Sequence, residues 1–220
     1  MRRFSLRYTL LTYRLDQLWL PAAFWALFVI ISLFRNEPDG VLDMARAYLG
    51  TVLPLVGGIM AAYAVLDDPA LELRFATPTR AGQFLAERLG LILTIQAFCA
   101  FSFQGFALAL GVDLSILGTW VGVQLAWLIP TLTLMALGCA GSLLAAQTVT
   151  GAFLAGFVWL MQLLARGWLA QNAGRYVLIF MGALMPDHPS LHANQISLSV
   201  LTVTFLFTAW VLLHRQERYI

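Results

Sequence analysis

Long uncharged runs of mostly apolar residues alternate with short polar segments along the 220-residue chain. An α-helix of roughly 20 apolar residues crosses the hydrocarbon core of a bilayer, which is about 30 Å thick. Residues 114–165 contain no charged residue over 52 positions, which is enough for two crossings. The pattern predicts an all-α integral membrane protein with six transmembrane helices, at about residues 18–34, 47–66, 89–111, 116–145, 151–166 and 193–213.

The residues before the first predicted span, 3–17, have an amphipathic pattern. Phe4, Tyr8, Leu11 and Leu15 share one helical stripe, and arginines occupy an adjacent one. This pattern predicts an N-terminal amphipathic helix in the headgroup region, with its arginines near anionic lipid. The alternative is a helical extension of the first span.

Two segments between the predicted spans have a distinct composition. Residues 35–46 are polar and contain Pro38 and Gly40, so they are predicted to be a linker. Residues 176–186 are uncharged but number only 11, which is too short to cross and typical of a re-entrant or interfacial segment. The whole chain, residues 1–220, is expected to form one transmembrane domain.

The distribution of positive charge predicts the orientation, because cytoplasmic loops carry an excess of Lys and Arg. With six spans and both termini inside, nine of the 13 arginines lie on the inner side and four on the outer side. We therefore expect a protein of the cytoplasmic membrane with both termini in the cytoplasm. The inner arginines are Arg2, Arg3, Arg7, Arg14, Arg74, Arg80, Arg88, Arg215 and Arg218, and the outer ones are Arg35, Arg46, Arg166 and Arg175.

Composition excludes several kinds of chemistry. The chain is 60% hydrophobic and 11% charged, and all 13 basic residues are arginine. Without lysine it can form neither a Walker A phosphate loop nor a Schiff base with retinal or pyridoxal. Cys99 and Cys139 lie in apolar spans with no metal-binding or disulfide spacing, so we interpret them as small buried side chains. No cofactor, metal ion or nucleic-acid partner is expected for this chain.

Residues 67–88 are the most highly charged internal segment, with seven charged residues between two uncharged runs. Asp68 followed by Pro69, and Thr77 followed by Pro78, are signals of a helix N-cap and first turn. Because a residue before proline is disfavoured in the helical region, the chain is expected to bend at Thr77. We predict a short helix along the cytoplasmic surface, a corner, and a second helix that continues into the third span.

The stretch LELRFATPTR, residues 71–80, is similar to the T-L-E-L-L-L-x-x-P-V-S-R stretch of ABC-2-type transporter permeases. The preceding acidic pair Asp67-Asp68, the six predicted spans and the N-terminal amphipathic helix also match the layout of that family. Arg74 stands where the family usually has an apolar residue, and TPTR is one residue shorter than x-P-V-S-R. The motif covers roughly 20 residues, whereas the layout covers the whole chain.

The resemblance implies that this stretch is a coupling helix, which docks in a cleft of a separate ATP-binding cassette subunit. That partner would bind ATP and Mg²⁺, so this chain would not itself be an enzyme, and a second permease subunit, identical or related, would complete the complex. The alternative is a solvated loop that contacts nothing. The predicted contact residues are Leu71, Glu72, Arg74, Phe75, Thr77, Pro78 and Arg80.

The predicted spans contain amides and hydroxyls but no Asp, Glu, Lys or Arg near their centres. Charges inside a membrane are costly and mark ion pathways, so their absence argues against a proton-driven carrier and an intramembrane metalloenzyme. Gln96, Gln104 and Gln124 are candidates for lining a substrate path. Interhelical hydrogen bonding is the alternative and the commoner role of such residues.

Gly151 and Ala155 form a small-x-x-x-small pair, which lets helices approach closely. In ABC-2 permeases the first and fifth spans flank the dimer seam, so both residues are candidates for that contact. Close packing within one subunit is the alternative. His188 and His192 have a spacing that can bind metal, but Pro189 interrupts the helix this requires, so we predict a surface loop.

These observations favour the permease subunit of an ATP-driven exporter that works by alternating access across a dimer interface. Two other classes stay open. One is a membrane assembly or sensor subunit that binds a partner without transporting, and the other is a lipid-modifying membrane enzyme.

Overall fold

A computed structural model describes residues 18–35, 37–67 and 81–214, and all regular structure within them is helical. The predicted amphipathic helix at 3–17 and most of the charged segment lie outside these residues. The elements are α2 (Trp19–Arg35), α3 (Pro38–Ala47), η2 (Tyr48–Val52), α4 (Leu53–Tyr63), α6 (Ala81–Ala109), η3 (Leu114–Leu117), α7 (Trp120–Ala145), α8 (Thr148–Leu164), α9 (Arg166–Gln171), η4 (Ala173–Val177), α10 (Met181–Leu184) and α11 (Leu191–Leu213).

Four helices of the described chain are long and apolar enough to cross a membrane: Pro38–Tyr63, Gly82–Ala109, Trp120–Ala145 and Leu191–Leu213. The first of these comprises α3, η2 and α4 in continuous succession. The apolar helices α2 and α8 have 17 residues each. At a rise of 1.5 Å per residue each is about 26 Å long, slightly less than the thickness of the hydrocarbon core. The chain is therefore a helical, multi-pass membrane protein by composition, and crossing by α2 and α8 stays a prediction.

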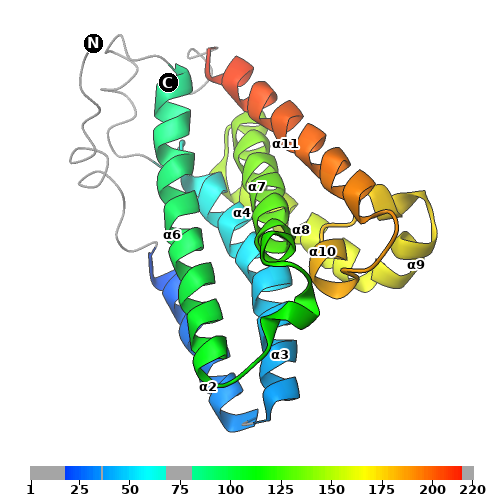
Figure 1. Ribbon diagram of the computed structural model, residues 1–220. Helices are drawn as coiled ribbons and strands as arrows, with labels where there is room; N and C mark the ends of the chain where they lie inside the picture. Colours follow the sequence, from blue (N-terminus) through cyan, green and yellow to red (C-terminus); the bar gives the residue numbers. More distant parts are fainter. Residues whose placement is uncertain (1–17, 36, 68–80, 215–220) are drawn as a thin grey trace.

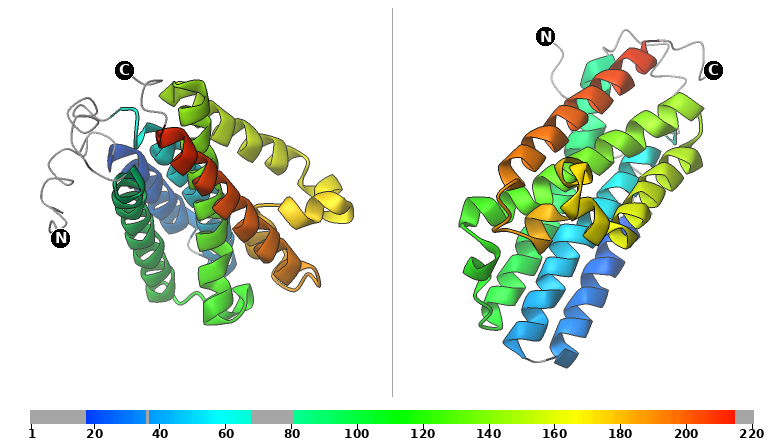
Figure 2. Two further views of the ribbon diagram at one scale, coloured as in Figure 1. Left: turned by 90° about the horizontal axis from the view of Figure 1, so that it is seen from above. Right: turned by 90° about the vertical axis from the view of Figure 1, so that its right-hand side faces the viewer.

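The central element is α7, which packs against α4, α8 and α11 (Figure 1). In α7, 67% of the most apolar 18-residue stretch is buried, whereas in α11 the buried share is only 22%. α6 and α11 meet where the first turn of α6 adjoins Trp210, and they diverge toward their other ends (Figure 2). The fold is thus a compact centre of α4, α7 and α8 with α2, α6 and α11 on its outside.

Glycines allow the three central backbones to touch. A Cβ on Gly138 in α7 would overlap the carbonyl oxygen of Gly58 in α4. A Cβ on Gly151 in α8 would lie 2.6 Å from the amide nitrogen of Ser142 in α7. Both obstacles are backbone atoms, which cannot move aside as a side chain can. Helices pack this closely in membranes because small residues remove the side chains between them.

Residues 38–47 differ from prediction, because the expected polar linker is the helix α3. Pro38 occupies the first turn, where its missing N–H is not needed. Val41, Leu42 and Ala45 are buried, whereas Asp43 is exposed and lies 3.7 Å from the half-buried Arg46. The amphipathic pattern was hidden by the high polar content of a single exposed face.

The boundaries around α7 follow local turn chemistry. Gly118 has φ of 115°, and the Thr119 hydroxyl accepts a hydrogen bond from Gly122 N at 3.2 Å, so α7 begins at Trp120 rather than near residue 116. Its end confirms the predicted turn after residue 145, where Ala146 has φ of 53° and Gln147 N donates to the Ser142 carbonyl at 3.0 Å. This is the hydrogen bond of a Schellman cap.

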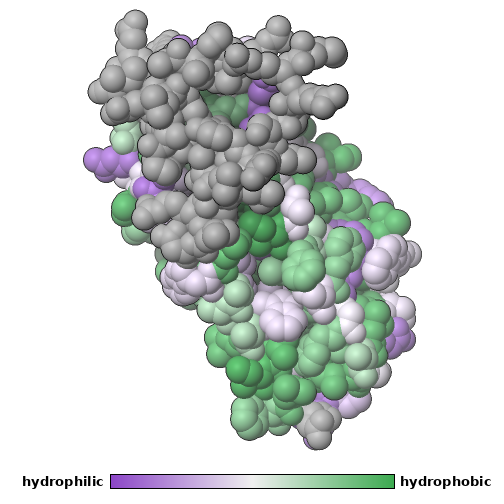
Figure 3. All heavy atoms as spheres, turned by 90° about the vertical axis from the view of Figure 1, so that its left-hand side faces the viewer, coloured by the Kyte–Doolittle hydropathy of each residue, from purple (hydrophilic) through white to green (hydrophobic). Residues whose placement is uncertain are grey.

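Large apolar side chains remain exposed on the outer helices. Figure 3 shows the face that carries α2 and α6, with hydrophobic residues over much of the visible surface. Soluble monomers rarely expose contiguous apolar patches of this kind, whereas a bilayer covers them. The residues on these two helices include Leu27, Ile30, Leu33, Phe34, Phe98, Phe101 and Leu108.

We predict that Gly151→Ala destabilises the protein by about 1–3 kcal/mol or more, because the added methyl group meets backbone atoms of α7. Gly156→Ala on the same helix is the matched control, since its Cβ would meet nothing within 4 Å. Thermal unfolding of the detergent-solubilised protein measures both variants. Equal melting temperatures for the two variants would contradict the close approach of α7 and α8.

Candidate functional site

The predicted coupling residues Leu71, Glu72, Arg74, Phe75, Thr77, Pro78 and Arg80 lie outside the described residues. The chain on both sides of them is described. Ala64 and Val65, in the turn directly after α4, are buried, and α6 begins with Phe84 and Leu85 buried. These four side chains belong to one hydrophobic cluster, together with Leu143 of α7 and Leu213 of α11. The ends of four helices therefore meet at the point where the charged segment enters and leaves the bundle.

The start of α6 is tied to its neighbours by specific contacts. The Cβ position of Gly82 lies 3.3 Å from the indole nitrogen of Trp210 in α11. Arg88 is only 3% exposed, and its guanidinium carbon lies 5.7 Å from the centroid of the Phe84 ring. Such a buried cation over an aromatic ring is a favourable arrangement. The start of α6 is therefore in direct contact with α11.

Two of the three candidate path residues pair with each other. Gln124 Nε2 donates to Gln104 Oε1 at 2.8 Å, and Trp127 Nε1 donates to Gln124 Oε1 at 2.8 Å. Gln104 is on α6 and is 2% exposed, whereas the other two residues are on α7. The structure thus brings Gln104 and Gln124 together as an interhelical hydrogen-bonded pair, the alternative role that the sequence left open.

Gln96 lies apart from that pair, fully buried where α6 faces α4. Its Nε2 lies 3.3 Å from the sulfur of Met60, a weak acceptor, and its Oε1 has no hydrogen-bond partner among the described residues. A buried amide oxygen without a partner costs roughly 1–3 kcal/mol. The path role of Gln96 stays a prediction, and this conformation leaves it with an unused acceptor.

The remaining candidate residues either pack inside the chain or lie near its surface. Gly151 and Ala155 are both buried inside the single chain, with Gly151 against α7 and Ala155 close to Gly58 of α4. The structure therefore shows the within-subunit packing that was the alternative to a dimer contact. His188 bonds to Ser190 through a ring nitrogen at 2.7 Å, and no group of three or more metal-binding side chains occurs in the described ranges.

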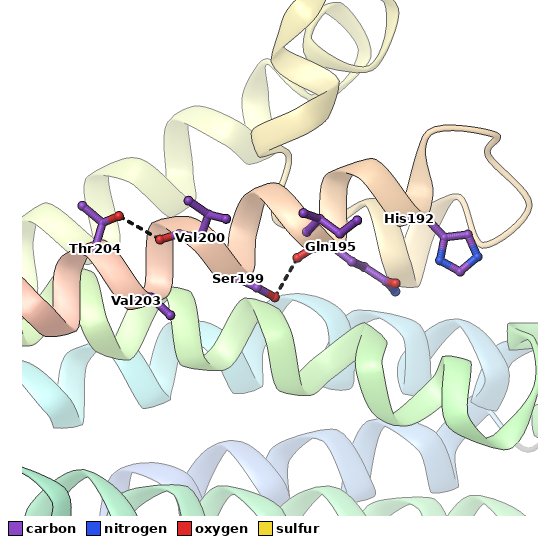
Figure 4. A pocket seen from close by; sticks show the side chains of 7 residues that line it. His192, Gln195, Ser199, Val200, Val203 and Thr204 are labelled. Carbon is purple, nitrogen blue, oxygen red and sulfur yellow. Dashed lines mark hydrogen bonds between the residues drawn. The ribbon is translucent and has the colours of Figure 1, made fainter.

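An open groove of about 470 Å³ runs along the outer face of α11 (Figure 4). His192 lies at one end and Thr204 at the other, with Val200 and Val203 between them. The hydroxyls of Ser199 and Thr204 bond to carbonyls of their own helix, at 2.8 Å each. They need no external partner, so the groove suits an apolar neighbour such as lipid.

Residues 178–184, here called the inserted segment, lie within the short apolar stretch 176–186 that the sequence predicted to be re-entrant or interfacial. The sequence did not indicate which residues they contact. They lie on one flank of the bundle between the end of α8 and the start of α11 (Figure 1). Leu178, Ile179, Phe180 and Met181 are at most 2% exposed. The segment therefore packs into the bundle instead of lying on its surface.

Side chains from α8 and α11 hold the inserted segment by its backbone. Gln162 Oε1 accepts a hydrogen bond from Ile179 N at 2.8 Å. Asn194 Nδ2 donates to the carbonyls of Arg175 at 2.7 Å and Leu178 at 3.0 Å. Non-helical backbone is tolerated at membrane depth only when protein groups satisfy it in this way. Gln162 in α8 and Asn194 in α11 were the available sequence signals.

The segment ends against a π-helical turn, η2, in the middle of the Pro38–Tyr63 helix. A Cβ on Gly50 would overlap the Cβ of Ala183. Trp159 of α8 donates its indole N–H to the Thr51 carbonyl at 2.8 Å, and its ring packs edge-on against Phe180 at 6.2 Å. Single π-turns inside α-helices occur frequently at functional sites. Two parts of the chain that are far apart in sequence therefore meet here.

Comparison with known proteins adds no independent assignment. No protein-family model matches the sequence, and no curated protein matches it. The functional argument therefore depends on the residues of this chain and their arrangement.

We predict that Gly50→Ala lowers the free energy of unfolding by about 1–3 kcal/mol, because the new methyl group occupies the space of the Ala183 side chain. The double variant Gly50→Ala/Ala183→Gly moves the methyl group across the interface and should recover stability to within about 1 kcal/mol. Thermal unfolding of both variants is the measurement. If the double variant is no more stable than Gly50→Ala alone, the contact is not as described.

Proposed function

We propose that the chain is the permease subunit of an ATP-driven transporter of the ABC-2 type, working as an exporter. A separate ATPase subunit would bind ATP and Mg²⁺ and dock at residues 67–88. A second permease subunit, identical or related, would complete the transport unit. The proposal places the protein in the cytoplasmic membrane with both termini in the cytoplasm.

The observation that carries the proposal is the convergence of helix ends next to the charged segment. The end of α4 and the start of α6 share one apolar cluster with the ends of α7 and α11. A partner that moved the intervening residues would act on α4 and α6 at once, and through them on the central helix.

The kinds of polar side chain inside the long helices also support transport that is driven by a separate ATPase subunit. Away from residues 38–46 and 87–88, the four long described helices contain amides and hydroxyls but no Asp, Glu, Lys or Arg. Proton- and ion-coupled carriers use intramembrane charges for energy coupling. A chain that lacks both these charges and lysine needs a partner to supply free energy.

We predict that Glu72→Ala and Arg74→Glu each lower ATP hydrolysis stimulated by the permease by about tenfold, the change that corresponds to ~1.4 kcal/mol of lost interaction. The partner to be tested is an ATPase with a Walker A motif from a neighbouring reading frame, co-expressed and co-purified with this chain. Asp39→Ala is the matched control, because Asp39 is an exposed acid on α3, outside the cluster of helix ends. Failure of any ATPase to co-purify, or wild-type stimulation by both variants, would refute the coupling role.

The proposed topology predicts opposite labelling of two cysteines in a background with Cys99→Ala and Cys139→Ala. Thr79→Cys should react with a membrane-impermeant maleimide only from the cytoplasmic side. Asp187→Cys, at an exposed position, should react only from the opposite side. Right-side-out and inverted membrane vesicles provide the two measurements. Labelling of both cysteines from the same side would exclude the six-span arrangement.

A further inference from the structure

Two arginines of the described ranges are half-buried, Arg46 on α3 and Arg175 in η4. Arg175 donates a hydrogen bond to the Tyr176 hydroxyl at 2.9 Å. Arg46 has no hydrogen-bond acceptor among the described residues. Its Nε is buried without a partner, and its Nη1 lies 3.7 Å from Asp43 Oδ1, which is beyond hydrogen-bonding distance. The guanidinium of Arg46 can therefore donate to a group from outside the described chain.

Arg46 lies where the hydrocarbon core is expected to end. α3 is at the end of the bundle opposite the start of α6 (Figure 1). Residues 47–66 contain no charged residue, and a helix of about 20 residues matches the thickness of the core, roughly 30 Å. Arg46 directly precedes this run on the continuous helix Pro38–Tyr63. Lipid headgroups occupy this depth, and arginine side chains near helix ends extend toward them.

The surroundings of Arg46 leave one side of it accessible. Gly50, about one helical turn further along the same face, contacts Ala183 of the inserted segment, and α3 itself contacts α10. The side chain of Arg46 is 32% exposed and that of Asp43 is 61% exposed. A ligand can therefore reach both charged groups from outside the bundle.

Asp43 determines which kind of ligand complements the site. A purely anionic ligand would be attracted by Arg46 and repelled by the carboxylate next to it. A zwitterion avoids this conflict, because its cationic group can bind Asp43 while its anionic group binds Arg46. In a phosphoethanolamine headgroup a two-carbon link joins the phosphate to the ammonium group. Its opposite charges are thus close neighbours, as are those of Asp43 and Arg46.

We propose that Arg46 and Asp43 form a binding site for the zwitterionic headgroup of a phospholipid of the ethanolamine class. The guanidinium donates to two phosphate oxygens, and the carboxylate accepts from the ammonium group. Exposed ion pairs contribute little to stability, so the direct pair of Asp43 with Arg46 is easily exchanged for these contacts. A choline headgroup has no N–H to donate to Asp43 and binds less well. The site is independent of the proposed transport function.

The test measures lipid retention by the full-length protein in detergent, using native mass spectrometry. The probes are phosphatidylethanolamine, phosphatidylcholine and phosphatidylglycerol with identical acyl chains. We expect the ethanolamine lipid to be retained about tenfold more strongly than either of the others, since a hydrogen bond to a charged group is worth at least that factor.

Variants assign the two halves of the headgroup to the two side chains. Arg46→Ala should remove the preference for the ethanolamine lipid, and Arg46→Lys should restore it only in part, because lysine lacks the planar fork. Asp43→Asn should abolish the discrimination between ethanolamine and choline and increase the retention of phosphatidylglycerol. Asp39→Asn and Arg166→Ala are the matched controls, because both change an exposed charge elsewhere and should leave the preference unchanged.

The thermal unfolding of each variant is measured first, and Asp43→Asn, at an exposed position, decides the test if the Arg46 variants do not fold. Equal retention of the three lipids by the wild type, or an unchanged preference in Asp43→Asn, overturns the site. Soluble O-phosphoethanolamine is the second probe. If it binds with the same dependence on Arg46 and Asp43 while the lipids are retained equally, the ligand is water-soluble and the assignment to a lipid is overturned.

Discussion

The bundle depends on the direct approach of three helix backbones. α4, α7 and α8 meet at Gly58, Gly138 and Gly151, where no side chain separates them. Contacts of this kind cannot slide without backbone overlap, so the three helices behave as one block. α6 and α11 lie outside the block and keep much of their apolar surface exposed. Rearrangement within the molecule is therefore expected at the outer helices.

The chain satisfies its interrupted backbone without using charge. Hydrogen-bonding groups left unpaired in hydrocarbon cost several kcal/mol each, so every break in a helix needs a partner. Here Gln162 and Asn194 bind the inserted segment, and the indole of Trp159 binds the π-turn. Neutral donors and acceptors do this without the desolvation cost of an ion. The position of the inserted segment therefore depends on a few amide side chains.

The helices could be predicted from sequence, because uncharged runs and turn signals are local properties. The turn after residue 145 and the helical start of α6 before residue 89 were both predictable in this way. α3 was not, since its polar residues concealed a buried face formed by Val41, Leu42 and Ala45. The position of the inserted segment could not be predicted either. It depends on the contact of Gly50 with Ala183, two residues that are far apart in the sequence and share no local pattern. The pairing of Gln104 with Gln124 likewise depends on the packing of α6 beside α7.

The π-turn at Tyr48–Val52 has a consequence for the phase of the helix that contains it. One extra residue in a turn rotates everything beyond it by about 100° relative to an uninterrupted α-helix. Val41 and Ala45 before the turn, and Leu53 and Val56 after it, are all buried, because that rotation brings the two pairs onto one side of the helix. The buried positions of α3 and those of α4 therefore follow the 3.6-residue helical repeat in two different sequence registers. A deletion of one residue within the turn would give an uninterrupted α-helix whose two apolar faces still point to the core, whereas the full sequence in a regular α-helix would direct one of them away.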